Sequence, residues 1–326
     1  MKLYTRILSR IHPFTLGTVK DENLSKKIFL KLMKIAWKVL TLLNDNPIIV
    51  TYLLHGKSFY INAKHALPKM KLKWPYYDTS LTEIARFIEC NLGYVTAIDI
   101  GANIGDTALN LRMGCSGKIL CIEPSKNFYE ILCMNSATIE PIDKLNIFIG
   151  ESGLVASSLD ETKSGTAIAT SSSESKVIDT ATKTIDEIIK LYPDYKDTNL
   201  IKIDTDGWDF SVLRSAKSLI HKAKPFIFFE YMPELILKYG NEEPLGIIEI
   251  LKDLEYYDVI LYDGWGYIYG KIDLRNEDEY LSFLKLFTQC VSNYSPYWLD
   301  FLTCHISDRS HLENFYKKEM RRLNYY

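Results

Sequence analysis

The sequence has almost no excess of charge of either sign, with 39 Lys and Arg against 41 Asp and Glu. A general nucleic-acid-binding protein carries a strong basic excess, so the formal net charge of −2 argues against that class of partner. No apolar run reaches membrane-spanning length, and the first residues lack the apolar core and cleavage site of a signal peptide. A cytoplasmic location is therefore predicted.

Cysteine pairs of the kind that bind zinc are also lacking. The six cysteines form no C-x-x-C pair, and the six histidines are scattered along the chain. Several cysteines lie in apolar segments, which predicts buried, reduced thiols and no zinc site. The length of 326 residues is enough to bury a large core and allows one large domain or two.

The most informative stretch runs from Ala97 to Thr107 and reads Ala-Ile-Asp-Ile-Gly-Ala-Asn-Ile-Gly-Asp-Thr. It predicts a buried strand that ends at a glycine turn and continues into a helix. The next apolar run, residues 118–122, ends in Glu123. In open α/β sheets ligands bind beyond the carboxyl ends of the strands, where an acidic residue can accept hydrogen bonds from ribose hydroxyls. These two segments predict a site for a nucleoside-containing cofactor.

The spacing of the glycines argues against a nicotinamide cofactor. A dinucleotide site uses G-x-G-x-x-G, whereas here Asn103 stands where the second glycine would make room for a pyrophosphate. Asp99 would repel phosphates but suits the ammonium group of a ligand that carries an amino acid. The pattern D-x-G-x-N-x-G, followed by a strand ending in Glu123, resembles the class I S-adenosylmethionine-dependent methyltransferases. A strand–glycine–helix joint without a ligand is the plainer alternative.

Four later motifs narrow the resemblance. In order, they are Thr184–Ile188, Ile201–Asp209, Val212–Ala216 and the apolar run Pro225–Glu230. This order resembles the FkbM family of methyltransferases over about residues 95–270. Asp206 and Asp209 stand where that family has Glu, and Ser215 stands where it has Gly. The carboxylates are kept, so the departures bear on the geometry of the substrate and not on the chemistry.

The resemblance and the alternation of strands with helices imply an α/β fold. The expected architecture is a Rossmann-like, doubly wound, mostly parallel sheet of the class I methyltransferase type. We expect an N-terminal extension with a helix and a hairpin over residues 1–80 and the methyltransferase domain over residues 81–272. Residues 273–326 are expected to form a C-terminal helical appendage.

The N-terminal extension contains two predicted elements, a helix and a hairpin, and a second helix follows it. Residues 22–44 read as a helix in which Lys27, Lys31, Lys34 and Lys38 form one basic face. That face could make peripheral contact with the inner membrane, or the lysines could face water while the apolar side packs on the sheet or on a second subunit of a homodimer. Residues 48–54 and 58–62 have the pattern of a hairpin. Residues 80–91 read as a helix, with Ser80 and Glu83 at capping-box spacing.

Two further segments do not follow the predicted alternation of strands with helices. The Ser- and Thr-rich piece from residue 157 to 184 predicts a hairpin or a mobile loop near the substrate. The tail is helical in pattern over residues 280–287 and 312–322. Its Tyr294, Tyr297 and Trp298 could stack on a sugar ring, although such clusters are more often core or interface.

The resemblance implies a set of cofactor-binding residues. They are Asp99, Gly101, Ala102, Asn103, Gly105, Glu123, Pro124, Ser125, Glu151 and Ser152. Asp99 is expected to face the methionine amine, directly or through water, with the glycine loop along the methionine end.

The residues of that set from Glu123 onward are expected to bind the nucleoside end of the cofactor. Glu123 is expected to hold the ribose diol, and Pro124 and Ser125 to border the adenine. The turn that contains Glu151 and Ser152 is where a contact to the adenine amino group is expected.

The catalytic residues are expected to be Asp204, Asp206 and Glu230, with Lys202 offsetting part of their charge. Crowded carboxylates raise one another's pKa values, which suits a general base that takes the proton of an acceptor hydroxyl. The same oxygens could instead hold a divalent cation such as Mg²⁺, the less favoured alternative. For Asp206 alone, capping of the helix after Gly207 is a structural alternative.

The family resemblance implies methylation of a hydroxyl on a small molecule, such as a sugar in a surface-glycan or secondary-metabolite pathway. No N-P-P-Y-like motif follows Asp204, so methylation of the amino groups of bases is not expected. Two other classes of function remain as alternatives. One is a catalytically inactive, cofactor-binding scaffold protein, and the other is a nicotinamide-dependent reductase, although no Tyr-x-x-x-Lys pair supports it.

Overall fold

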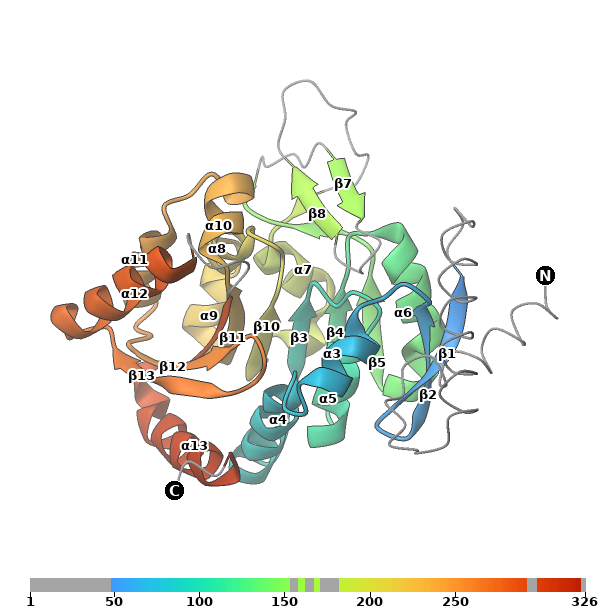
Figure 1. Ribbon diagram of the computed structural model, residues 1–326, viewed down its shortest axis with the longest axis horizontal. Coiled ribbons are helices and arrows are strands. Elements are labelled where there is room, and N and C mark those ends of the chain that lie inside the picture. Colours follow the sequence, from blue (N-terminus) through green and yellow to red (C-terminus); the bar gives the residue numbers. More distant parts are fainter. Residues whose placement is uncertain (1–47, 153–157, 162–166, 171–181, 292–297, 324–326) are drawn as a thin grey trace, which may run out of the picture.

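A computed structural model of the chain describes residues 48–152, 158–161, 167–170, 182–291 and 298–323 (Figure 1). Its centre is an eight-stranded sheet in the order β13-β12-β14-β11-β10-β3-β4-β5. These strands are β3 (Ala97–Ile100), β4 (Ile119–Ile122), β5 (Ile142–Leu145), β10 (Leu200–Ile203), β11 (Phe226–Tyr231), β12 (Asp258–Asp263), β13 (Ile268–Asp273) and β14 (Leu299–Thr303).

The five strands from β11 to β5 pair in parallel, as expected. From β3 the chain proceeds to β4 and β5 on one side and then returns to β10 and β11 on the other, so the order reverses between β3 and β10. The expected doubly wound, mostly parallel sheet is confirmed. Such a reversal point is where open α/β sheets bind ligands, beyond the carboxyl ends of the strands.

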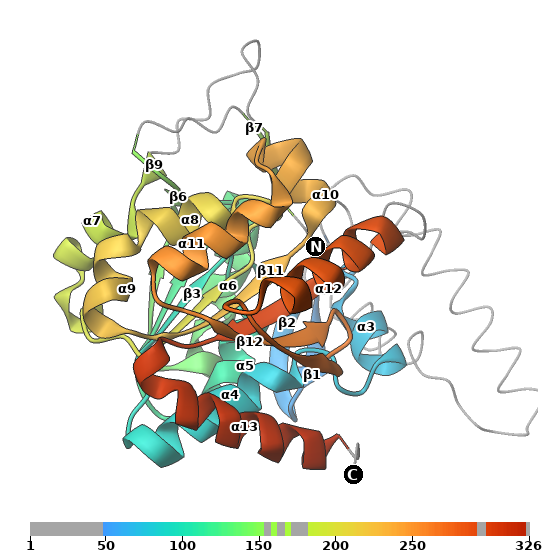
Figure 2. The same cartoon turned by 90° about the vertical axis from the view of Figure 1, so that its left-hand side faces the viewer.

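Helices cover both faces of the sheet (Figure 2). One layer consists of α4 (Thr79–Leu92), α5 (Asp106–Gly114), α6 (Lys126–Ile139) and α13 (Arg309–Arg322). The other consists of α7 (Ile185–Leu191), α8 (Asp209–Ser215), α9 (Lys217–Ala223), α11 (Ile247–Asp253) and α12 (Glu277–Val291).

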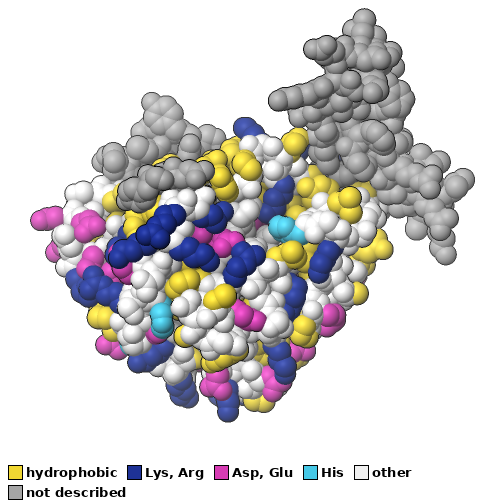
Figure 3. Space-filling view, turned by 90° about the horizontal axis from the view of Figure 1, so that it is seen from below, with side chains coloured by type: hydrophobic (Ala, Val, Ile, Leu, Met, Phe, Trp, Pro, Cys, Tyr) yellow, Lys and Arg dark blue, Asp and Glu magenta, His cyan; other side chains and the backbone are white. Residues whose placement is uncertain are grey.

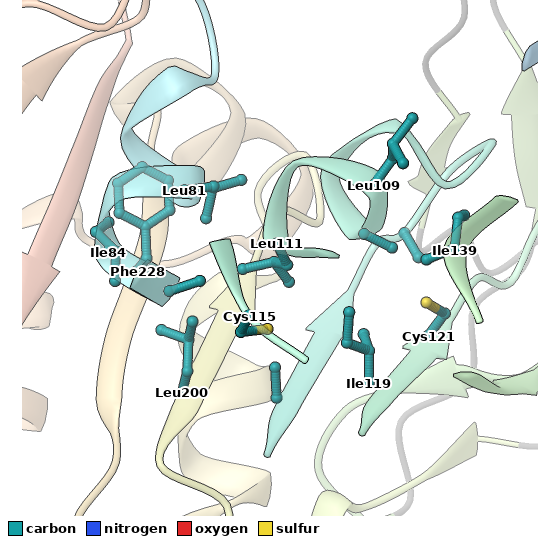
Figure 4. Close-up of a cluster of buried hydrophobic side chains, with 14 of the residues drawn as sticks. Leu81, Ile84, Leu109, Leu111, Cys115, Ile119, Cys121, Ile139, Leu200 and Phe228 are labelled. Atoms are coloured by element: carbon teal, nitrogen blue, oxygen red, sulfur yellow. The ribbon is translucent and has the colours of Figure 1, made fainter. Parts of the chain in front are cut away.

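Apart from Asp99 in β3 and Lys202 in β10, the central strands are apolar on both sides because each face meets a helical layer. In β10, for example, Leu200 belongs to the core beneath α4 and α5, whereas Ile201 belongs to the core beneath α8. Figure 4 shows part of the first core, where Leu81 and Ile84 of α4 meet Leu111 of α5. Short connecting elements complete the list: α3 (Leu67–Lys73), α10 (Pro233–Leu235), the π-helix Ile236–Gly240, and 3-10 turns at Pro193–Tyr195, Pro244–Gly246 and Ile306–Asp308.

The predicted N-terminal hairpin is present as β1 (Ile49–Leu54) and β2 (Lys57–Asn62). His55 and Gly56 form its turn with φ angles of 51° and 74°, the left-handed conformation that two-residue hairpin turns require. Asn135 of α6 fixes the hairpin to the domain, since its side chain accepts a hydrogen bond from the Tyr60 N–H at 2.7 Å and donates to the Tyr60 carbonyl at 2.9 Å. The predicted helix over residues 22–44 lies outside the described residues.

The predicted helix over residues 80–91 is α4, but its expected capping box is wrong. The helix begins one residue earlier, after Asp78, which is left-handed at a φ of 56° and makes no side-chain cap. Ser80 is buried instead, and Glu83 pairs with Arg86 and with Lys318 of α13. The burial of Ser80 and the contact of Glu83 with Lys318 are tertiary interactions, which the local spacing of the two residues does not reveal.

The Ser- and Thr-rich piece was predicted to be a hairpin or a mobile loop, and it contains a hairpin. β7 (Ser158–Glu161) pairs antiparallel with β8 (Ala167–Thr170) and projects at the top of Figure 1. The two-residue strands β6 (Phe148–Ile149) and β9 (Thr182–Lys183) pair in parallel at its base. The rest of this piece lies outside the described residues.

The C-terminal region has the two expected helices, α12 and α13, but calling residues 273–326 an appendage needs a correction. β14 enters the sheet between β11 and β12 and pairs antiparallel with both. Residues 299–303 are apolar except for Asp300 and Thr303, and strand pairing of such a segment satisfies its backbone in the middle of the sheet. A segment this short does not differ in periodicity from a buried helical turn, so its place was not predicted.

On the face seen from below (Figure 3), Lys and Arg side chains lie beside Asp and Glu side chains. Ion pairs within or from α13 include Lys317 with Glu313 at 3.8 Å and Lys318 with Glu83 at 3.5 Å. Among the helices of the described ranges, none is long and apolar enough to cross a membrane.

The position of β14 makes a stability prediction. Leu302 is fully buried and pairs with Phe228 on one side and Ile260 on the other. Leu302→Ala should lower the free energy of unfolding by about 2–5 kcal/mol, the usual cost of such a cavity. Leu53, 67% exposed on the hairpin, supplies the control, and Leu53→Ala should change stability by less than about 0.5 kcal/mol. Urea unfolding measures both, and a loss below about 1 kcal/mol for Leu302→Ala would contradict the insertion of β14.

Candidate active site

A cavity of about 360 Å³ opens beyond the carboxyl ends of β3, β4, β10 and β11. It lies at the point where the strand order reverses. Its lining residues are His65, Ala66, Leu67, Met70, Tyr77, Asp78, Ile100, Gly101, Asn103, Asp106, Thr107, Ile122, Glu123, Pro124, Phe128, Ile147, Phe148, Ile149, Asp204, Thr205, Asp206, Glu230, Met232 and Trp298.

The glycine loop after β3 forms one wall of this cavity. At Gly101 the φ angle is +77°, and a Cβ atom there would stand 1.8 Å from the carbonyl oxygen of Asp204. Glycine is therefore needed because the loops that follow β3 and β10 touch. Gly105 has a different reason, since a Cβ there would meet the side chains of Leu132 and Ile139 of α6 at 2.7 and 2.8 Å.

Some residues expected along the cofactor thus lie behind the cavity wall. Gly105 and the fully buried Ala102 are not among the lining residues, whereas Gly101 and Asn103 are. Asn103 is itself left-handed at a φ of 48°.

Lys202 joins the two loops beneath the cavity. Its ammonium donates to the Gly101 carbonyl at 2.9 Å and lies 3.2 Å from Asp99 and 3.4 Å from Asp204. Burial alone lowers the pKa of Lys202, but Asp99 and Asp204 outweigh it and raise the pKa above its ordinary value. The lysine is therefore a fixed positive charge, in line with the expectation that it offsets the carboxylates.

Asp99 does not reach the cavity. Its side chain is fully buried and accepts a hydrogen bond from the Thr107 hydroxyl at 2.7 Å in addition to its pair with Lys202. A direct contact between Asp99 and a ligand is not formed in this arrangement. Asp106, the first residue of α5, does line the cavity and is 8% exposed.

Glu123 occupies the expected position at the end of β4. One carboxylate oxygen accepts a hydrogen bond from the Asn103 N–H at 2.8 Å and the other from the Ser125 N–H at 2.7 Å. Burial raises the pKa of Glu123 to about 7, and these hydrogen bonds act in the opposite direction. Pro124 lines the cavity as expected, but the buried Ser125 side chain caps α6 by accepting from the Phe128 N–H at 3.2 Å.

Glu151 and Ser152 lie outside the cavity lining. Glu151 forms an ion pair with Arg214 at 2.9 Å, and Arg214 also binds Glu242 at 2.7 Å. The Glu151 carboxylate is therefore held by a guanidinium. Ser152 is exposed.

Asp204, Asp206 and Glu230 meet in the cavity, as the sequence predicted. Burial and the charges of Asp204 and Asp209 raise the pKa of Asp206 to about 8. Burial, Asp204 and Asp206 raise the pKa of Glu230 well above its ordinary value. Crowding and desolvation thus favour the protonated form of these two groups at neutral pH.

The helix-cap alternative for Asp206 is wrong. Its backbone is left-handed at a φ of 51°, and α8 begins three residues later. Asp209 closes this turn instead by accepting hydrogen bonds from the Thr205 and Gly207 N–H groups at 3.3 and 3.2 Å.

Several lining residues come from segments in which the sequence pointed to no site. Asp78 lies 3.7 Å from Lys71, and burial raises its pKa to about 6. Burial lowers the pKa of His65 to about 4, so that imidazole is neutral at neutral pH. Tyr77 and Met232 also line the cavity, and of the tail aromatics Trp298 does, while Tyr294 and Tyr297 lie outside the described residues.

In the part of the chain that the structure describes, no group of three or more His, Cys, Asp or Glu side chains is placed to hold a metal ion.

We compared the sequence with models of known protein families, and one family model matches it. Residues 99–257 match the family model described as the methyltransferase FkbM domain, which confirms the resemblance seen in the motifs. No curated protein matches the chain.

Solved structures give more distant likenesses. The methyltransferase FkbM structure from Methylobacillus flagellatus KT is 16% identical with a TM-score of 0.35, over 51% of this chain and 39% of that one. Magnesium protoporphyrin IX methyltransferase from Synechocystis PCC 6803, with bound SAH, is 7% identical with a TM-score of 0.38, over 73% and 86%. A SAM-dependent methyltransferase from Leishmania major is 12% identical with a TM-score of 0.37, over 74% and 77%.

The buried position of Asp99 makes a prediction for Lys202. Lys202→Met should lower the free energy of unfolding by about 3–5 kcal/mol, because it leaves the Asp99 charge buried without a partner. In the double variant Asp99→Asn, Lys202→Met, part of that loss should be recovered, since the uncompensated charge is gone. Urea unfolding of the three proteins tests this, and a double variant less stable than Lys202→Met alone would refute the explanation.

Proposed function

We propose, from the premise that residues 99–257 form an FkbM methyltransferase domain, that the protein transfers a methyl group from S-adenosylmethionine to a hydroxyl of a small molecule. S-adenosylmethionine supplies the methyl group on a cationic sulfur, with a neutral thioether as the leaving group. The observation that carries the proposal is the cavity in which Glu123 faces Asp204, Asp206 and Glu230 across the reversal point of the sheet.

The residues around Glu123 fit the nucleoside of that cofactor. Each Glu123 oxygen holds one backbone N–H and has capacity for a ribose hydroxyl, which would bring a partner to a carboxylate that is otherwise desolvated. Beside it, Ile122, Pro124, Phe128 and residues 147–149 form an apolar wall suited to the adenine ring. Glu151 would serve the adenine only at the rim, because Arg214 holds it.

The methionine end would lie along Gly101 and Asn103. The ammonium group of the cofactor needs a carboxylate, and Asp106 is the one that both lines the cavity and belongs to this loop–helix joint. Asp99 would act from below by fixing Lys202 and Thr107. We therefore assign the direct contact to Asp106 and an indirect role to Asp99.

The carboxylates opposite the cofactor would accept the proton of the acceptor hydroxyl. Asp204 is 42% exposed and paired with Lys202, so it can stay charged and reach an acceptor. Asp206 and Glu230 have raised pKa values, and a carboxylate with a raised pKa is a stronger base when it is ionised. Direct base action by this group is our preferred mechanism over activation of the hydroxyl by a divalent cation.

The acceptor we propose is a sugar, with Trp298 in the lining as a surface for a ring to stack on. Carbohydrate modification in the cytoplasm would fit this assignment. An inactive scaffold protein would have no need of three carboxylates in one cavity, so we rank that function second.

The first test concerns the cofactor. Glu123→Ala should weaken binding of S-adenosylmethionine by about 1–3 kcal/mol, because the ribose hydroxyls lose a charged acceptor. Glu130 lies in α6, which follows Glu123 in the chain, and it is exposed. Glu130→Ala is therefore the matched control, and it should leave the affinity for S-adenosylmethionine unchanged. Calorimetry measures both, and binding of NAD, or equal affinity in the two variants, would rule out the assignment.

The second test concerns the base. Asp204→Asn keeps the shape of the side chain and removes its charge, so turnover should fall by about 10²-fold or more while cofactor affinity changes little. A methyl-transfer assay with labelled cofactor measures this. Full turnover in the variant would place the base elsewhere, and loss of wild-type turnover in EDTA with rescue by Mg²⁺ would favour the metal-assisted mechanism.

A further inference from the structure

We propose that the acceptor carries a protonated amino group close to its hydroxyls, and that the cavity selects such amino-sugar-like compounds over N-acetylated and phosphorylated ones. The inference rests on the proposed function and adds the charge of the acceptor to it.

The first argument is the charge of the cavity wall. Six carboxyl groups line it, and they belong to Asp78, Asp106, Glu123, Asp204, Asp206 and Glu230. No Lys or Arg is among its described lining residues, and the one basic side chain there, His65, is neutral at neutral pH. A phosphate group in this cavity would meet carboxyl groups, and none of the described lining residues would offer it a cation.

The cations behind the wall are already engaged. Lys71 lies 3.7 Å from Asp78 and donates to the Tyr77 carbonyl at 2.6 Å. Lys202 is shared between Asp99 and Asp204. The cofactor itself brings a sulfonium, an ammonium and a carboxylate, a net charge of one, so it does not match all six carboxyl groups of the lining, and those on the acceptor side can ionise against a further cation.

The second argument is a missing partner at Glu230. Its Oε2 atom is shielded from solvent and makes no hydrogen bond to any described residue. Buried carboxylate oxygens normally have such a partner, because desolvation without one is costly. An ammonium group donating to Glu230 and its neighbour Asp206 would supply it and would favour the ionised form of both.

The third argument is a fixed aromatic wall. Trp298 packs edge-on against Trp265 at 4.9 Å, and Trp265 stacks on Trp74 at 3.5 Å. Gly264 lies so close that a Cβ there would stand 2.1 Å from the Trp298 ring. Such a ring can contact the apolar face of a sugar and attract an ammonium group through its π system.

The charge of the amino group also determines which atom of the acceptor receives the methyl group. An ammonium nitrogen has no lone pair with which to accept a methyl group, so an amine held in its protonated form is a recognition group. The neighbouring hydroxyl, whose proton passes to a carboxylate, remains the acceptor.

The test uses the full chain saturated with S-adenosylhomocysteine, whose binding is measured first. Failure of that binding would count against the proposed function and not against the charge of the acceptor. D-glucosamine, D-glucose, N-acetyl-D-glucosamine and D-glucosamine 6-phosphate are then titrated by calorimetry. We expect glucosamine to bind about 10-fold or more tightly than the other three, the usual effect of a charge-assisted hydrogen bond.

Variants separate charge from stacking. Glu230→Gln should reduce the preference for glucosamine over glucose to about 2-fold or less, because it removes the charge that holds the ammonium group. Trp298→Ala should weaken all the sugars alike. Asp194→Asn, which removes an exposed charge paired with Lys118, is the control and should preserve the preference.

Each remaining outcome overturns the proposal. Equal binding of glucosamine and its N-acetyl form would remove the role of the amine. Tighter binding of the 6-phosphate would contradict the charge argument, and no binding of glucosamine to the S-adenosylhomocysteine complex would reject the acceptor class.

Discussion

The buried ammonium group of Lys202 is the interaction on which the rest of the site depends. It binds the Gly101 carbonyl and two carboxylates at 2.9–3.4 Å, and it thereby ties the loop after β3 to the loop after β10. Those two loops flank the reversal point of the sheet. Without a cation at this place, Asp99 would be charged in the core and the Asp204 loop would lack its anchor.

A second constraint is the concentration of negative charge above that anchor. Desolvation and mutual repulsion raise the pKa values of Asp78, Asp106, Glu123, Asp206 and Glu230. A ligand that brings positive charge would stabilise such an arrangement, and the sulfonium cofactor that we propose would bring one.

The cavity is lined both by residues inside the range that matches the family model and by residues outside it. The β3, β4, β10 and β11 ends lie within residues 99–257 or at their border, whereas Asp78, Tyr77 and Trp298 come from outside that match. Part of the cavity lining therefore comes from segments that the family model does not cover.

From the sequence by itself, local patterns predicted the alternation of strands with helices, the glycine loop and the position of Glu123, because strand ends and helix starts are local. The resemblance in the motifs added the doubly wound sheet and the carboxylates at 204, 206 and 230. Only the tertiary structure decided that Asp99 is buried, that Ser125 caps α6 and that β14 lies between β11 and β12. It also brought His65, Asp78 and Trp298 to the cavity. Trp298 is separated from His65 and Asp78 by more than 200 positions in the sequence, and they meet only because of the way the layers pack. The spacing of residues within a short segment carries no information about such contacts.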